Sequence, residues 1–147
     1  MNHRSLGNTG LDVSVIGLGT HQFSGEWAKT FSASEVEQML GRARELGLNL
    51  LDTAECYGDH SVEALVGAAI KKRRSEWIVA TKFGHRYISS TVKEEAWSAA
   101  QVQQQIESSL RALQTDHIDL YQFHSGSNAA FDNDKIEGIA KGVATLI

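Results

Sequence analysis

The sequence of 147 residues predicts an α/β fold built around a parallel sheet. Three observations support this prediction. Short apolar segments alternate with amphipathic segments of helical period, after a single N-terminal hairpin. Each interval between the apolar segments is long enough for one crossover helix, which is the connection that parallel strands require. The same order of elements is compatible with a doubly wound sheet and with part of a (β/α) barrel.

The N-terminal elements are a hairpin and a buried strand. Gly7 and Gly10 bracket a predicted turn, and Val13 and Val15 lie at alternate positions of the strand that follows. The segment "VIGLGT", residues 15–20, then predicts the first strand of the parallel sheet.

The first helix is expected to begin at Ser34. Glu37, three residues further on, completes a capping box, and Gly47 is suited to end the helix. An apolar row at helical spacing marks the face that packs on the sheet. The members of this row are Val36, Met39, Leu40, Ala43 and Leu46.

The remaining elements continue the alternation. "LNLLDT", residues 48–53, has three leucines in four positions, which suits a strand buried on both faces. Helix 61–72, strand 77–82, helix 98–114 and strand 117–124 follow in that order. The inner row of the helix over 98–114 is predicted to be Val102, Ile106, Ser109, Leu110 and Leu113.

An atypical C-terminal helix is predicted over residues 135–147. Asp134 can cap this helix, and Glu137 completes a capping box three residues later. We find no linker, internal repeat or low-complexity segment, so residues 1–147 are expected to form a single domain.

Composition excludes several classes of protein. The net charge of −4 argues against a general binder of nucleic acids or anionic membranes, because neither has a large positive surface to contact. Cys56 is the sole cysteine, so an internal disulfide is excluded and a reducing compartment is favoured. No signal peptide or run of about 18 apolar residues is present. We therefore expect a cytoplasmic protein.

Polar residues follow the predicted strands at one edge of the sheet. In either parallel architecture, ligands bind at the carboxyl ends of the strands. The first strand ends at Gly19 and Thr20, and the next three end at Asp52, Lys82 and His124. The sequence therefore predicts that these side chains share one rim.

Tyr57 lies five residues beyond Asp52, in the loop on the same rim. A phenol titrates near ~10 in water, and a nearby ammonium favours the phenolate and lowers that value. Lys82 can supply this ammonium, held in place by Asp52, and His124 can form a hydrogen bond to the same substrate atom. Each residue alone is more often structural than catalytic, but their joint placement favours catalysis.

The neighbours of Tyr57 are expected to lie outside this constellation. Glu55, Cys56, Asp59 and His60 are interpreted as loop and helix-entry residues, with Asp59 or Ser61 as a cap for the next helix. Trp27, in the loop after the first strand, is expected to line the substrate pocket.

Three other readings of the sequence are weaker. Gly17 and Gly19 begin a dinucleotide fingerprint, but Gln22 replaces its third small residue, which argues against a Rossmann domain. A second hypothesis makes Cys56 a nucleophile with His60 or His124 as its base, but the sequence predicts no helix N-terminus or oxyanion donor next to Cys56. The six histidines show no paired ligand spacing, so no metal site is expected.

Four motifs taken together resemble the aldo-keto reductases. They are "GLGT", "LDTAECYG", "ATKFG" and "IDLYQFH", and the match runs from residue 1 to about residue 134. The resemblance implies a (β/α)8 barrel with an N-terminal hairpin at its bottom. It also implies the NADPH-dependent reduction of a small-molecule carbonyl substrate to an alcohol.

The same resemblance assigns roles to the rim residues. Tyr57 is similar to the general acid of the family. Lys82 and Asp52 resemble the pair of residues that lowers the pKa of this general acid. His124 resembles the residue that orients the carbonyl group. Gly19, Thr20 and Asp52 match positions near the nicotinamide and ribose of the cofactor, and His21 matches a substrate-pocket position.

The length of the chain predicts a half-barrel. A (β/α)8 barrel needs about 250 residues, whereas residues 1–147 supply four βα units and an N-terminal β-hairpin. In the family, most contacts with the dinucleotide come from the second half. Two hypotheses follow. The first is an NADPH-dependent aldo-keto reductase that is inactive or impaired as this chain. The second is a half-barrel that self-associates through its open edges into a homo-oligomer, lacks competent cofactor binding and acts as a structural or interaction module.

Overall fold

The computed structural model describes residues 1–26, 28–89, 92–124, 137 and 139–141. Trp27 and most of the helix predicted over 135–147 lie outside the described residues. No helix within these ranges is long and apolar enough to cross a membrane.

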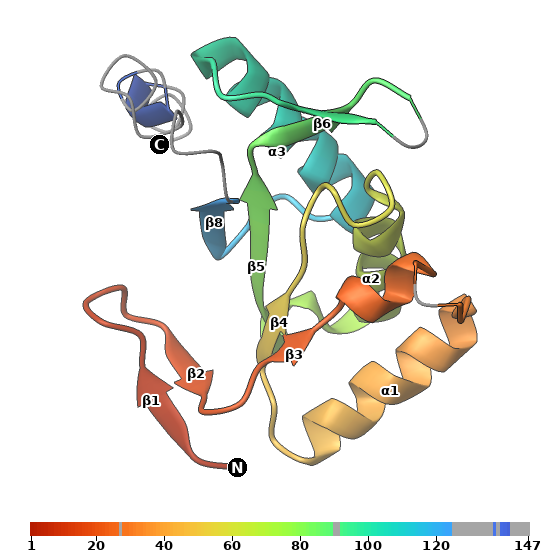
Figure 1. Cartoon of the computed structure of the whole chain (residues 1–147). Coiled ribbons are helices and arrows are strands. Elements are labelled where there is room, and N and C mark those ends of the chain that lie inside the picture. Colours follow the sequence, from red (N-terminus) through yellow and green to blue (C-terminus); the bar gives the residue numbers. More distant parts are fainter. Residues whose placement is uncertain (27, 90–91, 125–136, 138, 142–147) are drawn as a thin grey trace.

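A parallel sheet of four strands forms the centre of the structure (Figure 1). Its strand order is β3-β4-β5-β8, and every neighbouring pair is parallel. The strands are β3 (Leu18–Gly19), β4 (Leu50–Asp52), β5 (Ile78–Phe83) and β8 (Leu120–Phe123). This architecture confirms the predicted partial α/β barrel, although β3 is shorter than expected because only two of its residues pair.

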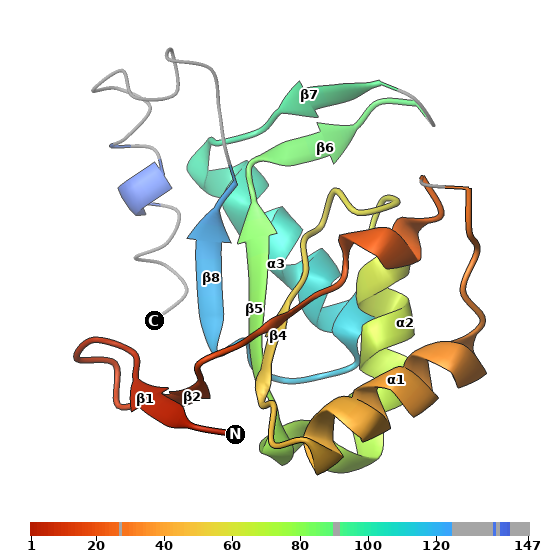
Figure 2. The ribbon, with the colours of Figure 1, turned by 60° about the horizontal axis from the view of Figure 1, so that its bottom comes forward.

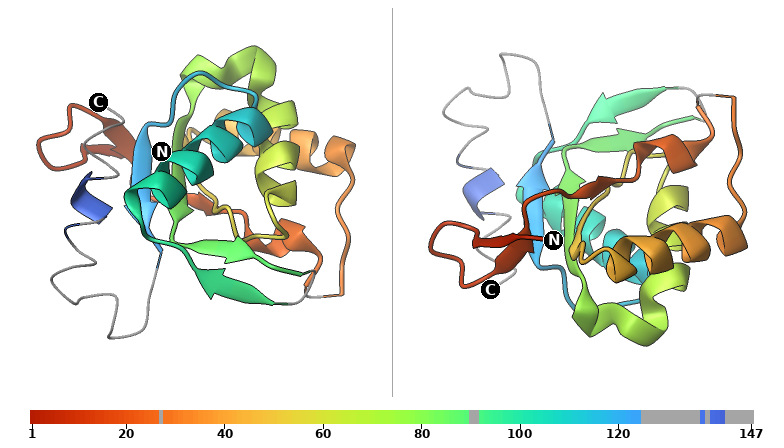
Figure 3. Two further views of the ribbon diagram at one scale, coloured as in Figure 1. Left: turned by 90° about the horizontal axis from the view of Figure 1, so that it is seen from above. Right: turned by 90° about the horizontal axis from the view of Figure 1, so that it is seen from below.

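Helices cover one face of the sheet (Figures 2 and 3). They are α1 (Ala33–Glu45), α2 (Ser61–Ile70) and α3 (Ala99–Leu113). Helix α2 packs between the other two, and two short 3-10 helices, η1 (His21–Ser24) and η2 (Lys71–Glu76), complete the connections. The core between sheet and helices includes the buried residues Val36, Leu40, Leu51, Val62, Val66, Val79 and Leu113.

The N-cap of α1 is Ser32, two residues before the predicted Ser34. The sequence contains two overlapping S-x-x-E patterns, and the structure uses the first. The Ser32 hydroxyl accepts a hydrogen bond from the Glu35 backbone N–H at 3.2 Å, and the Glu35 carboxylate accepts one from the Ser32 N–H at 2.8 Å. Ser34 therefore lies inside the first turn. Gly47 follows the end of the helix with a φ of +85°, as its predicted role requires.

The buried rows of α1 and α3 differ from the predicted ones. Met39 and Leu46 of the α1 row are exposed, which leaves a narrower buried face. In α3, Gln105 is buried, whereas Ile106 and Leu110 are only partly buried. A polar side chain enters this row because the loop that it contacts offers two backbone partners.

Two hairpins lie at opposite ends of the sheet. The predicted N-terminal hairpin, β1 (His3–Ser5) with β2 (Asp12–Ser14), is confirmed and is antiparallel. The Asn49 side chain ties it to the amino end of β4, accepting from the Ser14 N–H at 2.7 Å. A second hairpin, β6 (His85–Tyr87) with β7 (Lys93–Glu95), follows the carboxyl end of β5 (Figure 1). Its charged strands lack the apolar alternation that predicts a hairpin.

The face of the sheet opposite the helices is incompletely covered. Leu50 and Ile78 lie opposite each other in β4 and β5 and are only partly buried, whereas Leu51 and Val79, which point toward the helices, are fully buried. Within the described residues, β3 and β8 each pair with one neighbour only. Both features agree with a barrel wall that is open on its inner face and at its two edges.

Candidate active site

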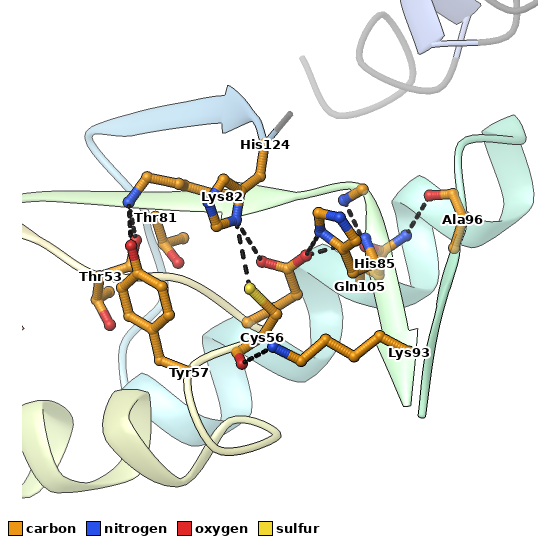
Figure 4. A network of polar contacts seen from close by, with 12 residues as sticks. Thr53, Cys56, Tyr57, Thr81, Lys82, His85, Lys93, Ala96, Gln105 and His124 are labelled. Atoms are coloured by element: carbon orange, nitrogen blue, oxygen red, sulfur yellow. Dashed lines mark hydrogen bonds and ion pairs between the residues drawn. The ribbon is translucent and has the colours of Figure 1, made fainter. Parts of the chain in front are cut away.

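Three of the predicted site residues are in contact at the carboxyl end of the sheet. Lys82 donates from Nζ to Asp52 Oδ1 at 2.8 Å and to the Thr53 carbonyl oxygen at 2.8 Å. The same nitrogen lies 3.4 Å from the phenol oxygen of Tyr57 (Figure 4). A fixed ammonium therefore stands against the phenol, as the sequence predicts.

Strand register explains this placement. Asp52 pairs with Ala80 in the parallel ladder, and Lys82 lies two residues further along β5, on the same face as Ala80. Tyr57 is presented by a turn in which its N–H donates to the Ala54 carbonyl at 3.2 Å. The lysine can therefore reach both groups from one side of the sheet.

The carboxyl end of β3 lies beside Asp52. Thr20 is fully buried and donates from both its backbone N–H and its hydroxyl to the Asp52 carbonyl, each at 3.0 Å. Gly19 is exposed, and a Cβ at this position would meet no atom within 4 Å. Thr20 thus fastens β3 to β4, and Gly19 leaves open space at the rim.

Two histidine rings flank Tyr57. The His124 ring lies edge-on to the phenol, with 5.9 Å between ring centroids, and the His21 ring lies 4.6 Å away. Burial lowers the pKa of His124, so its imidazole is uncharged at neutral pH. An uncharged imidazole beside the phenol can form a hydrogen bond to a substrate oxygen.

Glu55 and Cys56 were predicted to be loop residues outside the site, but the structure places them next to His124. Both are buried, and Cys56 Sγ lies 3.4 Å from Nδ1 of His124. Glu55 accepts from the His85 N–H at 3.0 Å. No spacing rule could find this group, because its members come from the loop after β4, the start of β6 and the residue after β8.

The structure supports the geometry of the hypothesis that Cys56 is a nucleophile, but it opposes the chemistry. The structure does bring the thiol to His124. Burial, reinforced by the Glu55 carboxylate, raises the pKa of Cys56 to about 11. The thiol is therefore protonated at neutral pH, whereas a cysteine nucleophile needs the thiolate.

The entry to α2 also differs from the prediction. Neither Asp59 nor Ser61 caps the helix, because His60 occupies the N-cap position with a left-handed φ of 64°. Its Nδ1 lies 2.5 Å from Glu63 Oε2, and Glu63 Oε1 accepts from the Thr81 hydroxyl at 2.6 Å. Burial disfavours the imidazolium, but the Glu63 carboxylate outweighs it and raises the pKa of His60.

Gln105 organises the second hairpin above the site. Its side-chain oxygen accepts from the Gly84 N–H at 2.9 Å, and its side-chain nitrogen donates to the Ala96 carbonyl at 2.9 Å. The Trp97 indole donates to the Gly84 carbonyl at 3.1 Å. These bonds fix the backbone next to His85. A cleft of about 250 Å³ adjoins this region, lined among others by Glu55, Cys56, His60, His85, Tyr87 and Gln105.

A parallel sheet covered by helices on one face, with a lysine-paired phenol at its carboxyl ends, defines a partial (β/α) barrel with a candidate proton-transfer site. Residues 15–143 match the Aldo/keto reductase family. The chain belongs to this family.

Relatives of known sequence and structure agree with this assignment. The oxidoreductase YqkF of Bacillus subtilis is 38% identical to this chain over an alignment of 160 residues. The alignment covers 99% of this chain and 49% of YqkF. PA4992 of Pseudomonas aeruginosa, a protein assigned to the same family, is similar in structure with a TM-score of 0.85 and 36% identity, covering 98% of this chain and 55% of PA4992. The chain thus spans about half the length of these relatives.

One further structural relative was solved with a bound dinucleotide. An aldo-keto reductase of Klebsiella pneumoniae in complex with NADPH has a TM-score of 0.71 and 28% identity, covering 92% of this chain and 42% of that protein.

Proposed function

We propose that this chain carries the proton-donating half of an NADPH-dependent reductase that converts a small aldehyde or ketone to an alcohol. The observation that carries the proposal is the position of Lys82 Nζ, 2.8 Å from Asp52 Oδ1 and 3.4 Å from the Tyr57 phenol oxygen. When bound, NADPH supplies the hydride that reduces the carbonyl carbon.

The residues of the chain supply the proton and the orientation. Tyr57 transfers its phenolic proton to the carbonyl oxygen, and the Lys82 ammonium stabilises the phenolate that remains. Asp52 and the Thr53 carbonyl keep Lys82 aimed at the phenol. His124, uncharged, hydrogen-bonds the same oxygen and orients the carbonyl for protonation.

The rim fits the nicotinamide end of the cofactor. Open space at Gly19 leaves room for a flat ring against the backbone, and the Asp52 side chain is 43% exposed, which suits a contact with ribose. The NADPH complex of the Klebsiella pneumoniae relative supports the choice of dinucleotide. Because the resemblance places most cofactor contacts in the second half of the barrel, we propose that this chain alone binds NADPH weakly and is impaired.

A hybrid barrel tests this function. Residues 1–124 of the chain are joined to the second half of YqkF, and NADPH oxidation is followed with a small aldehyde as substrate. The proposal predicts turnover by the hybrid and little or none by the 147-residue chain. A folded hybrid that binds NADPH but reduces no aldehyde would refute it.

Self-association is a second candidate function, favoured by the uncovered barrel wall. Ile16, in the connection that leads into β3, is 58% exposed, and β3 and β8 each pair with one neighbour within the described residues. Two copies can cover these surfaces by closing edge to edge. Light scattering should find a dimer or larger assembly that Ile16→Lys weakens, whereas a monodisperse monomer at micromolar concentration would contradict it.

We also propose a cytoplasmic location. Cys56 is a buried free thiol and the sole cysteine, which suits a reducing compartment.

A further inference from the structure

Four potential metal ligands converge beside the proposed proton-transfer site. Glu55 and Cys56 come from the loop after β4, His85 begins β6, and His124 follows β8. One donor atom from each residue lies within 4.8 Å of the donor atoms of the other three. Figure 4 shows the imidazoles of His85 and His124 and the thiol of Cys56 close together.

Their spacing suits a tetrahedral cation. Cys56 Sγ lies 3.4 Å from His124 Nδ1, His85 Nδ1 lies 3.6 Å from Glu55 Oε1, and His124 Nδ1 lies 4.0 Å from Glu55 Oε2. Bonds of about 2.0–2.3 Å to zinc place neighbouring ligand atoms about 3.3–3.8 Å apart. Only small side-chain movements are needed to bring all four donors onto one ion.

Unpartnered polar atoms point independently to a ligand. Among the described residues, Glu55 Oε2 and His85 Nδ1 are buried and have no hydrogen-bond partner. Glu55 is only 3% exposed, and burying a carboxylate oxygen without a hydrogen bond is costly. A cation bound between these two atoms would satisfy both.

We propose that Glu55, Cys56, His85 and His124 form a Zn²⁺ site. A thiolate, two imidazoles and one carboxylate are the donors that zinc prefers, whereas Mg²⁺ and Ca²⁺ favour oxygen ligands alone. As the Zn–S bond forms, the S–H bond breaks and its proton passes to solvent. The thiolate and the carboxylate then balance the two positive charges of the ion.

The surroundings hold these ligands in place. The His85 N–H donates to Glu55 Oε1 at 3.0 Å, and the Cys56 carbonyl accepts from Tyr87 Oη at 3.1 Å and from Lys93 Nζ at 3.2 Å. The cleft of about 250 Å³ that Glu55, Cys56 and His85 line offers the ion an entry path. The expectation of no metal site rested on local spacing, which cannot detect ligands from three separate elements.

Metal binding would also affect the neighbouring site. With Nδ1 of His124 on the ion, the ring proton resides on Nε2, so the imidazole is held as a hydrogen-bond donor. The zinc site itself does not rest on the proposed reductase function, because it depends only on the four donors.

Titration of the metal-free chain with Co²⁺ and Zn²⁺ tests the site. We expect one equivalent of Co²⁺ to bind with a thiolate-to-cobalt charge-transfer absorbance, which Zn²⁺ displaces. Because Cys56 is the sole cysteine, this absorbance in the wild-type chain reports Cys56 without any variant. Circular dichroism before and after addition ensures that the folded chain is measured.

Variants then assign the ligands. Cys56→Ser should abolish the charge-transfer absorbance, and His85→Gln should weaken Zn²⁺ binding by at least about tenfold. His117→Gln is the matched control, because His117 is exposed and its ring pairs with the neighbouring Asp116, away from the four ligands. A folded wild-type chain that shows no thiolate absorbance with Co²⁺, or binding that His85→Gln and His117→Gln leave equally unchanged, would overturn the proposal.

Discussion

Lys82 places its ammonium nitrogen 3.4 Å from the phenol oxygen of Tyr57, although 25 residues separate them in the sequence. Strand β5 carries the lysine, and the loop after β4 carries the phenol. Parallel pairing of these strands makes the contact possible, because it brings their carboxyl ends to one rim.

Substitutions of Lys82 and Asp52 should differ in severity. Lys82→Met removes the ammonium and should lower kcat of the hybrid barrel by at least about 100-fold. Asp52→Asn should lower kcat by a smaller factor, because the Thr53 carbonyl oxygen still accepts a hydrogen bond from Lys82 at 2.8 Å. Steady-state kinetics with one aldehyde measures both, and an Asp52→Asn loss larger than that of Lys82→Met would contradict this ranking.

Gly67 should tolerate no side chain. A Cβ at this position in α2 would lie 2.4 Å from the Leu113 carbonyl oxygen, so Gly67→Ala forces α2 and α3 apart. We expect the free energy of unfolding to fall by about 2–3 kcal/mol. Gly41 in α1 is the matched control, because its Cβ would meet nothing within 4 Å. Gly41→Ala should raise stability by up to about 1 kcal/mol, and equal effects in urea unfolding would refute the packing argument.

Gln105 should be more important for stability than its residue type suggests. Gln105→Leu leaves the buried Gly84 N–H without its acceptor, which should cost about 1–3 kcal/mol. The exposed Gln104 of the same helix is the control, and Gln104→Leu should change the free energy of unfolding by less than about 0.5 kcal/mol. Equal losses in the two variants would show that the buried amide bonds are not responsible.

His60 should make stability depend on pH. Its pKa is raised in the folded chain, so its pair with Glu63 stabilises the protein fully below about pH 6.5, the ordinary histidine value. This contribution is lost as the pH rises through the higher folded value. Urea unfolding between about pH 6 and pH 9 should show the decline in the wild-type chain and not in His60→Gln. If the difference in the free energy of unfolding between the two chains stayed constant over this range, the proposed role of His60 would be contradicted.

The rim residues were predictable because they obey a rule of topology. Asp52, Lys82 and His124 each end an apolar segment, and parallel strands bring such ends together. The start of α1 was misplaced because Ser32 and Ser34 both begin an S-x-x-E pattern, and local capping chemistry cannot choose between them.

The group around Glu55 could not be predicted. Glu55 lies in the polar segment of residues 51–60, and no periodic pattern of apolar residues around it indicates that it is buried. Its environment is created by the hairpin of β6 and β7, whose charged strands are themselves unpredictable from periodicity. Gln105 was missed for the same reason, since its partners belong to that hairpin.

The most direct test of the account is the effect of Tyr57→Phe in the hybrid barrel, with kcat and NADPH affinity measured separately. Loss of the phenolic proton should lower kcat by about 100-fold or more while leaving the dissociation constant of NADPH within about twofold. A Tyr57→Phe hybrid that reduces the aldehyde at the wild-type rate would contradict the assignment of Tyr57 as the proton donor.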